Sequence, residues 1–258
     1  MKDISIWREK FKITHYFVNP DGQASIQGLS YCLQETAVNH ATAGRFGYED
    51  LIRNNQAWVL TRQMIKLYQI PRVSEKIIIE SWVDSSTDSI SIRDFHILDE
   101  KDNILGLART SWMMLDLSSR KPVRIPSWLR EDFPHQTGRI MENLPLDKIP
   151  LIRETGKDII PFRVVYNDLD MNFHVNNIQY LKWVLDDFSY EFRLKYRLAS
   201  IESNYLSEAL YEDSLIRLTE QDTQNKEVFI TNIVNIKNSR PILSSRTKWV
   251  EKGQIIIH

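Results

Sequence analysis

Apolar and polar residues alternate along this chain in two rhythms, and both rhythms first appear in the N-terminal half. A spacing of four predicts a helix over about residues 30–40 with one buried face, formed by Leu29, Leu33, Ala37 and Ala41. Segments rich in β-branched and aromatic residues then predict strands at about 58–67, 76–83, 89–98 and 104–115. Polar residues 100–103 predict a hairpin turn between the last two. One helix followed by long strands indicates an antiparallel sheet wrapped around that helix.

The C-terminal half repeats this order. Apolar positions at helical spacing predict a helix from Asn177 to about Phe192. Strand patterns follow at about 199–209, 214–221, 226–237 and 242–251. Between the halves, about residues 126–156 contain several prolines and many charges, which is typical of a linker.

Short sequence matches support an internal duplication. Ala-Arg-Thr-Ser-Trp at 108–112 recurs as Ser-Arg-Thr-Lys-Trp at 245–249, and Leu-Ser-Tyr at 29–31 corresponds to Ile-Gln-Tyr at 178–180. Because the matches occur in the same order, we expect an N-terminal domain over 1–128, a linker over 129–157 and a C-terminal domain over 158–258.

Composition narrows the possible partners. The 258 residues have a formal net charge of −1, which argues against duplex nucleic acid as a partner. No apolar stretch approaches the roughly 20 residues of a membrane span. The single cysteine, Cys32, excludes a disulfide within the chain and suits a reducing compartment. With no signal or transit peptide recognisable at the N-terminus, we expect a cytoplasmic protein.

The segment with the clearest chemistry lies just before the second predicted helix. Asp170, Asn172 and His174 alternate, so in an extended segment they would face one way. Asn176 or Asn177 can cap the helix, and the N–H groups of its first turn would favour negative charge on a bound oxygen. Each residue alone is more often a cap or a structural residue, but together they favour a hydrolytic site.

This run resembles the catalytic motif of the acyl-acyl carrier protein (acyl-ACP) thioesterases of plants and bacteria. Residues 168–183 read Asp-Leu-Asp-Met-Asn-Phe-His-Val-Asn-Asn-Ile-Gln-Tyr-Leu-Lys-Trp. The family pattern is Asp-Leu-Asp-Val-Asn-x-His-Val-Asn-Asn-x-x-Tyr-x-x-Trp. Residues 33–40, 58–62, 82–83 and 109–114 also look like family segments, so the resemblance covers about 11–249. It implies an α+β tandem hotdog, with two antiparallel sheets each wrapped around a long helix.

The resemblance also implies a set of catalytic residues. Asp170, Asn172 and His174 fall on family catalytic positions, and Glu208 falls on the catalytic acid of the next strand. Ala209 replaces the cysteine of plant members, so a cysteine nucleophile at that position is excluded. We therefore expect water attack, with Glu208 as general base and His174 assisting. Asn172 would orient the thioester or the water, Asp170 would hold its neighbours, and the helix start at Asn176 and Asn177 would bind substrate and stabilise the oxyanion.

The first half lacks this set. Aligning Tyr31 with Tyr180 places Gln23 at Asn172 and Ser25 at His174. In the family the first half accommodates the acyl chain. Six apolar residues are candidates for lining its cavity, although ordinary core packing explains each equally well: Leu29, Leu33, Trp58, Leu60, Met64 and Met114.

The resulting expectation is a hydrolase of fatty acid biosynthesis that releases free fatty acid from acyl-ACP. Neither a metal-ligand cluster nor a Gly-rich phosphate loop is present in the sequence, so no cofactor or metal is expected. One alternative is a thioesterase for coenzyme A esters, which would not need a docking surface such as the basic cluster Arg120, Lys121 and Arg124. The other is a non-catalytic acyl-binding hotdog regulator. A tandem hotdog is compatible with a monomer or a homodimer.

Overall fold

The chain folds into two compact units, Met1–Leu146 and Asp147–His258. The computed structural model describes residues 4–140, 142–152 and 160–253. The division falls inside the predicted linker 129–157, of which residues 153–159 lie outside the described residues. Across the described parts of the chain, no helix is both long enough and apolar enough to cross a membrane.

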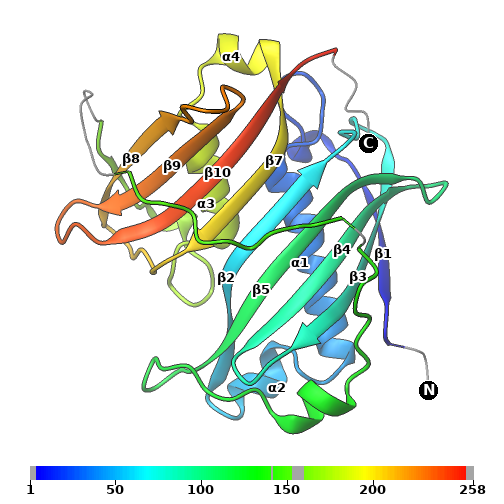
Figure 1. Ribbon diagram of the computed structural model, residues 1–258. Coiled ribbons are helices and arrows are strands. Elements are labelled where there is room, and N and C mark those ends of the chain that lie inside the picture. The colour runs from blue at the N-terminus through cyan, green and yellow to red at the C-terminus, as the bar shows by residue number, and fades with distance from the viewer. Residues whose placement is uncertain (1–3, 141, 153–159, 254–258) are drawn as a thin grey trace. The chain divides into compact units, whose positions relative to one another are not determined.

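Unit 1 is an antiparallel sheet with a long helix across one face (Figure 1). The strands lie in the order β1-β3-β4-β5-β2. Their bounds are Trp7–Lys12 for β1, Gln56–Leu67 for β2, Lys76–Ser86 for β3, Ile90–Asp99 for β4 and Ile104–Asp116 for β5. The helices are α1 (Ile26–Ala43) and the short α2 (Tyr48–Ile52), with single helical turns η1 (His15–Phe17) and η2 (Trp128–Asp132).

Unit 2 has the same plan with a shorter central helix. Its strands lie in the order β7-β10-β9-β8-β6. They span Phe162–Arg163 for β6, Tyr196–Tyr205 for β7, Ser214–Gln221 for β8, Val228–Asn235 for β9 and Pro241–Glu251 for β10. The helical segments are η3 (Tyr166–Asp168), α3 (Asn177–Leu185) and α4 (Tyr190–Lys195). The expected antiparallel α+β architecture is confirmed.

The two halves share a structural detail that the repeated Arg-Thr-x-Trp motif encodes. The indole N–H of Trp112 donates to Oγ1 of Thr110 at 2.9 Å, and that of Trp249 donates to Oγ1 of Thr247 at 3.1 Å. The first motif lies on β5, which pairs with β2 and β4. The second lies on β10, which pairs in the same way with β7 and β9. The duplication seen in the sequence is therefore present in the backbone and in the side chains.

The predicted helix from Asn177 to Phe192 is wrong in its second part. Helix α3 ends at Leu185, and α4 begins at Tyr190 after a separate N-cap, because Oγ of Ser189 accepts a hydrogen bond from the Phe192 N–H at 3.2 Å. Phe188, between the helices, packs against Phe192, Phe229 and Trp249. Burial of this aromatic cluster favours the break over a continuous helix.

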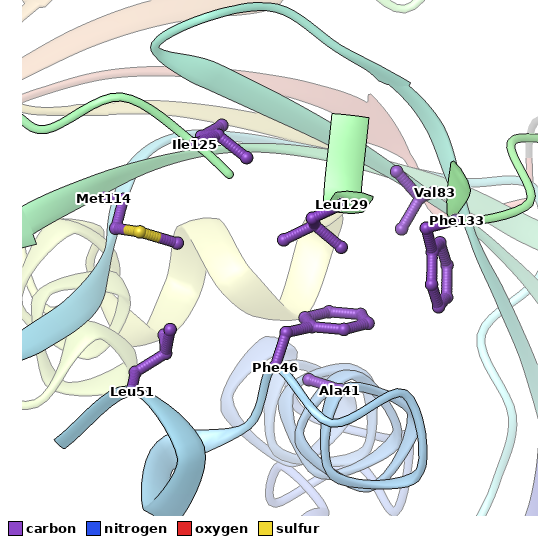
Figure 2. Packing of buried hydrophobic residues seen from close by; sticks show 8 residues of the cluster. All are labelled: Ala41, Phe46, Leu51, Val83, Met114, Ile125, Leu129 and Phe133. Atoms are coloured by element: carbon purple, nitrogen blue, oxygen red, sulfur yellow. The ribbon is translucent and has the colours of Figure 1, made fainter. Parts of the chain in front are cut away.

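The core of unit 1 includes residues from the predicted linker. Leu129 and Phe133 of that linker, together with Ile125 just before it, pack against Ala41, Phe46, Leu51, Val83 and Met114 (Figure 2). The ring of Phe46 meets that of Phe133 edge-on, with centroids 4.9 Å apart. The start of the linker therefore belongs structurally to the first unit.

Candidate active site

A tight turn before α3 carries the predicted catalytic residues. The N–H of Asp170 donates to the carbonyl of His174 at 2.8 Å, and the N–H of Phe173 donates to the carbonyl of Asp170 at 3.1 Å. Phe173 adopts a positive φ of 62° to close the turn. The segment is therefore not extended, since the chain reverses between Asp170 and His174, and the condition under which Asp170, Asn172 and His174 would face one way is not met.

The carboxylate of Asp170 organises this turn. Its Oδ1 accepts hydrogen bonds from the backbone N–H groups of Asn172 at 2.8 Å and His174 at 3.4 Å. An Asp side chain that bonds the backbone two residues later is a common device for fixing a turn. Asp170 therefore acts on its two neighbours through their main chain.

The turn brings His174 to Glu208, which follows β7. Nε2 of His174 lies 3.3 Å from Oε2 of Glu208, and both side chains are partly accessible to solvent. Main-chain contacts between the two segments support this approach. His174 forms an isolated antiparallel β-bridge with Leu210, and the Val175 N–H donates to the Ala209 carbonyl at 3.2 Å. An imidazole and a carboxylate in contact at the surface can accept and deliver a proton during attack by water.

Asn172 does not join this pair. Its side chain is exposed. Among the described residues, no hydrogen bond links its carboxamide to His174 or Glu208. Of the four predicted catalytic residues, the structure thus brings the side chains of His174 and Glu208 together, bonds that of Asp170 to the backbone of the turn, and leaves Asn172 exposed.

Helix α3 begins beside the turn with a side-chain cap. Oδ1 of Asn176 accepts a hydrogen bond from the Ile178 N–H at 2.9 Å, and Asn177 is the first helical residue. The other first-turn N–H groups of a helix carry a partial positive charge that favours an anionic oxygen nearby. The sequence allowed either Asn176 or Asn177 as the N-cap, and the structure shows that it is Asn176.

Replacing Asn176 by alanine is expected to lower the free energy of unfolding by about 1 kcal/mol, because the Ile178 N–H loses its partner. Urea denaturation monitored by tryptophan fluorescence would measure this loss. Asn177→Ala is the matched control and should cost less, since Asn177 lies inside the helix. Equal losses in the two variants would contradict the assignment of the cap.

Two residues near Glu208 were not assigned a role from the sequence. The hydroxyl of buried Tyr180 accepts a hydrogen bond from the Ala209 N–H at 3.1 Å. Nη2 of Arg240 donates to the Glu208 carbonyl at 2.8 Å. Burial raises the pKa of Tyr180, so the hydroxyl stays protonated. The sequence signal was the tyrosine in the motif, but its partner could not be read from spacing.

The corresponding turn of unit 1 has the same backbone and different side chains. The Asn19 N–H donates to the Gln23 carbonyl at 2.8 Å, as that of Asp170 does to His174, and Gly22 has the positive φ of Phe173. Gln23 bridges Arg72 as His174 bridges Leu210. Asn19, Asp21 and Gln23 therefore correspond to Asp170, Asn172 and His174, and Ile70 corresponds to Glu208.

This correspondence corrects the alignment of Tyr31 with Tyr180. The N-caps Ser25 and Asn176 are equivalent, and Tyr31 lies farther along its helix than Tyr180 does. The sequence alignment was therefore shifted by two residues, which had placed Ser25 at His174. Unit 1 still has neither an imidazole nor a carboxylate at the positions of His174 and Glu208.

The six residues expected to line an acyl cavity do not share one face of the sheet. Leu29, Leu33, Leu60, Met64 and Met114 are buried, and Trp58 is partly buried. In β2, Trp58 and Leu60 pair with Met114 and Trp112, but a bulge at Thr61 then reverses the alternation. Met64 consequently packs on the opposite face, with Trp82, Leu107, Ile140 and Leu144. A single cavity lined by all six is therefore wrong.

The thiol of Cys32 is not suited to act as a nucleophile. Cys32 lies fully buried in α1, and burial raises its pKa to about 12. Ala209, which follows Glu208, is also fully buried. Within the described ranges, no group of three or more His, Cys, Asp or Glu side chains is arranged to hold a metal ion.

Comparison with known protein families matches both units. Residues 5–133 match the acyl-ACP thioesterase N-terminal domain, and residues 153–251 match the acyl-ACP thioesterase C-terminal domain. The chain is 28% identical over 270 residues to the acyl-[acyl-carrier-protein] hydrolase FATB2 of Cuphea viscosissima, covering 98% of the chain and 65% of that protein. It is 28% identical to the oleoyl-acyl carrier protein thioesterase 2 of Arabidopsis thaliana, covering 88% of the chain and 66% of that protein. Both relatives are chloroplastic, and the chain spans about two thirds of their length.

Solved structures agree in fold. An acyl-ACP thioesterase from Bacteroides thetaiotaomicron superposes with a TM-score of 0.84 at 26% identity, covering 95% of this chain and 98% of that one. The 12:0-ACP thioesterase from Umbellularia californica superposes with a TM-score of 0.80 at 23% identity, covering 96% of this chain and 94% of that one. At that lower identity, the second match speaks for the fold alone.

Proposed function

The chain belongs to the acyl-ACP thioesterase family, and from that premise we propose that it hydrolyses the thioester of a fatty acyl chain carried by acyl carrier protein. The observation that carries the proposal is the contact between His174 and Glu208, at 3.3 Å, beside the start of α3. Unit 1 has glutamine and isoleucine at these two positions, so we assign catalysis to unit 2 and acyl-chain binding to unit 1.

The chemistry follows from the groups present. Glu208 takes a proton from water, and the resulting hydroxide attacks the thioester carbonyl carbon. The oxyanion that forms is stabilised by N–H groups in the first turn of α3 and by the imidazole of His174. The intermediate collapses by breaking its carbon–sulfur bond, and the departing thiolate takes up the proton that Glu208 removed from water, which restores the carboxylate. Asp170 holds the turn that presents His174, and Asn172 at the solvent-facing side orients the incoming thioester.

This route requires no thiol at the site. Ala209 follows Glu208, and Cys32 is buried in the other unit with a pKa raised by burial. A thiolate nucleophile needs a lowered pKa and access to substrate, and Cys32 has neither. Direct attack by water is therefore our proposed mechanism.

The carrier is proposed from the charge on unit 1. Arg120 and Lys121 lie exposed in the turn after β5, and exposed Arg124 pairs with Asp88 at 3.1 Å. A basic cluster can steer an acidic carrier protein towards the enzyme. An enzyme for coenzyme A esters would use the same residues near the thioester. The two possible carriers are therefore distinguished by comparing the rates at which their esters are hydrolysed.

The test is thiol release from acyl-ACP esters of about eight to eighteen carbons and from the corresponding coenzyme A esters. We expect kcat/KM to be at least about 10-fold higher for the carrier-protein ester, and this advantage to fall as salt screens the charges. Equal values for both carriers would favour the coenzyme A alternative. Tight acyl binding without turnover of any ester would favour a non-catalytic regulator.

We further propose a bacterial, cytoplasmic enzyme that acts as a monomer or as a homodimer. The single buried cysteine suits a reducing compartment. Cell fractionation and light scattering of the purified chain would test location and assembly.

A further inference from the structure

The peptide group that joins Glu208 to Ala209 is held on both sides by side chains. Its carbonyl accepts a hydrogen bond from Nη2 of Arg240 at 2.8 Å. Its N–H donates to the hydroxyl of Tyr180 at 3.1 Å. Strand β7 ends at Tyr205, so this peptide lies beyond the regular ladder. The orientation of the Glu208 backbone therefore depends on Tyr180 and Arg240.

Tyr180 is well placed to act as a fixed support. It belongs to α3, is 4% exposed, and packs edge-on against Trp183 and Tyr205. The ring positions leave its hydroxyl directed at the Ala209 N–H. A buried N–H without an acceptor is destabilising, which makes this hydrogen bond important for the local structure.

Unit 1 shows how the same backbone is built without the support. Pro71 stands at the position of Ala209, because the Ala24 N–H donates to its carbonyl as the Val175 N–H does to that of Ala209. Proline has no N–H and needs no acceptor. Counting from the N-caps Ser25 and Asn176, Leu29 occupies the position of Tyr180. The tyrosine hydroxyl and the N–H it satisfies thus occur together in the unit that carries Glu208 and are absent together from the other.

We propose that Tyr180 is a positioning residue whose hydroxyl, acting through the Ala209 N–H, fixes the carboxylate of Glu208 beside His174. This inference rests on the proposed hydrolysis. The Ala209 carbonyl also accepts from the Val175 N–H, next to His174, so one residue links the support to both members of the pair. Loss of the hydroxyl lets the peptide turn towards another acceptor and moves Glu208 away from His174.

The first test is Tyr180→Phe in the full chain. We expect kcat to fall at least about 10-fold with KM within about 2-fold of wild type, because small displacements of a catalytic group slow the reaction without weakening ground-state binding. Tyr68→Phe is the matched control, since it removes a hydroxyl bonded to Glu142 in unit 1 and should leave kcat unchanged. An unchanged kcat in Tyr180→Phe would overturn the proposal.

The second test asks whether activity is restored by a proline at position 209, as unit 1 has at the equivalent Pro71. Adding Ala209→Pro to Tyr180→Phe removes the orphaned N–H, so the double variant should regain at least about 5-fold in kcat over Tyr180→Phe. A double variant no more active than Tyr180→Phe would show that the hydroxyl does not act through this N–H.

A readout independent of turnover separates this proposal from the proposed function. Amide hydrogen exchange at Ala209, followed by NMR, should be at least about 10-fold faster in Tyr180→Phe than in wild type. If the wild type hydrolyses no ester, the proposed function fails. The exchange rate at Ala209 still tests whether the Tyr180 hydroxyl holds the Ala209 N–H. Equal exchange rates in the two proteins would overturn it.

Discussion

Replacing Glu208 by glutamine is expected to lower kcat for acyl-ACP hydrolysis at least about 100-fold, the scale of a lost general base. Glutamine keeps the size of the side chain and can still approach Nε2 of His174, now 3.3 Å from the carboxylate. It cannot take a proton from water. The loss should therefore appear in kcat rather than in KM, and steady-state thiol release would measure it.

Glu212→Gln provides the matched control. Glu212 lies a few residues further along the same surface segment and pairs with Arg163. Its replacement should leave kcat unchanged. If Glu208→Gln and Glu208→Ala both retain full activity while His174→Gln loses it, then His174 is the base and the mechanism proposed here is wrong in that assignment.

Acidification from pH 7 to pH 5 is expected to destabilise unit 1 through His40. This residue is fully buried in α1, with Nε2 at 2.7 Å from the Ile4 carbonyl and Nδ1 at 2.8 Å from Nη1 of Arg93. Because Arg93 can only donate, Nδ1 accepts and Nε2 carries the proton, so the ring is neutral. Burial, reinforced by the charge of Arg93, lowers the pKa of His40 to about 3.

The sign of the effect follows from this lowered pKa. Below the unfolded-state pKa of about 6.5, the unfolded chain binds a proton that folded His40 does not. The stability is therefore complete above about pH 6.5 and decreases as the pH falls towards 3, by about 1.4 kcal/mol per pH unit, or roughly 2 kcal/mol at pH 5. Urea denaturation at a series of pH values would show this slope.

His40→Asn is the control variant for this slope. The asparagine oxygen can still accept from Arg93, but the side chain does not titrate. Burial also lowers the pKa of His135, which contributes with the same sign, so the difference between wild type and the variant isolates His40. Parallel slopes in the two proteins between pH 7 and pH 5 would contradict a neutral, buried His40.

Local sequence patterns were sufficient for most of the fold. The turn at residues 100–103 and the Asn cap before the second helix each depend on hydrogen bonds within a few residues, and the strand over 214–221 shows in its own residue types before it pairs with β9. Such short-range preferences can be read from spacing and residue type. The duplication was also visible in the sequence. Its Arg-Thr-x-Trp motif forms a hydrogen bond between residues two apart, so both partners of the bond lie within the repeated segment.

Features that depend on distant partners could not be read in this way. The bulge at Thr61 is stabilised against β5, where the Thr61 hydroxyl donates to the Ser111 carbonyl at 2.9 Å, and it turns Met64 to the other face. The break between α3 and α4 depends on an aromatic cluster that includes Phe229 and Trp249 of the sheet. Period-two and helical patterns contain no information about these contacts.

The same division holds for the candidate site. By itself, the sequence determined the residue types, the family to which the chain belongs and the absence of a cysteine after Glu208. Only the tertiary structure decided which side chains meet: the turn at Phe173 sends Asn172 outward, and contacts from Ala209 bring Glu208 to His174 and Tyr180. The physical reason is that hydrogen bonds between segments far apart in the chain set the distances among His174, Glu208 and Tyr180, whereas the sequence pattern records only each segment's own preference. The turn itself closes within residues 170–174, but it needs a positive φ at Phe173, which a phenylalanine seldom adopts and the residue pattern does not indicate.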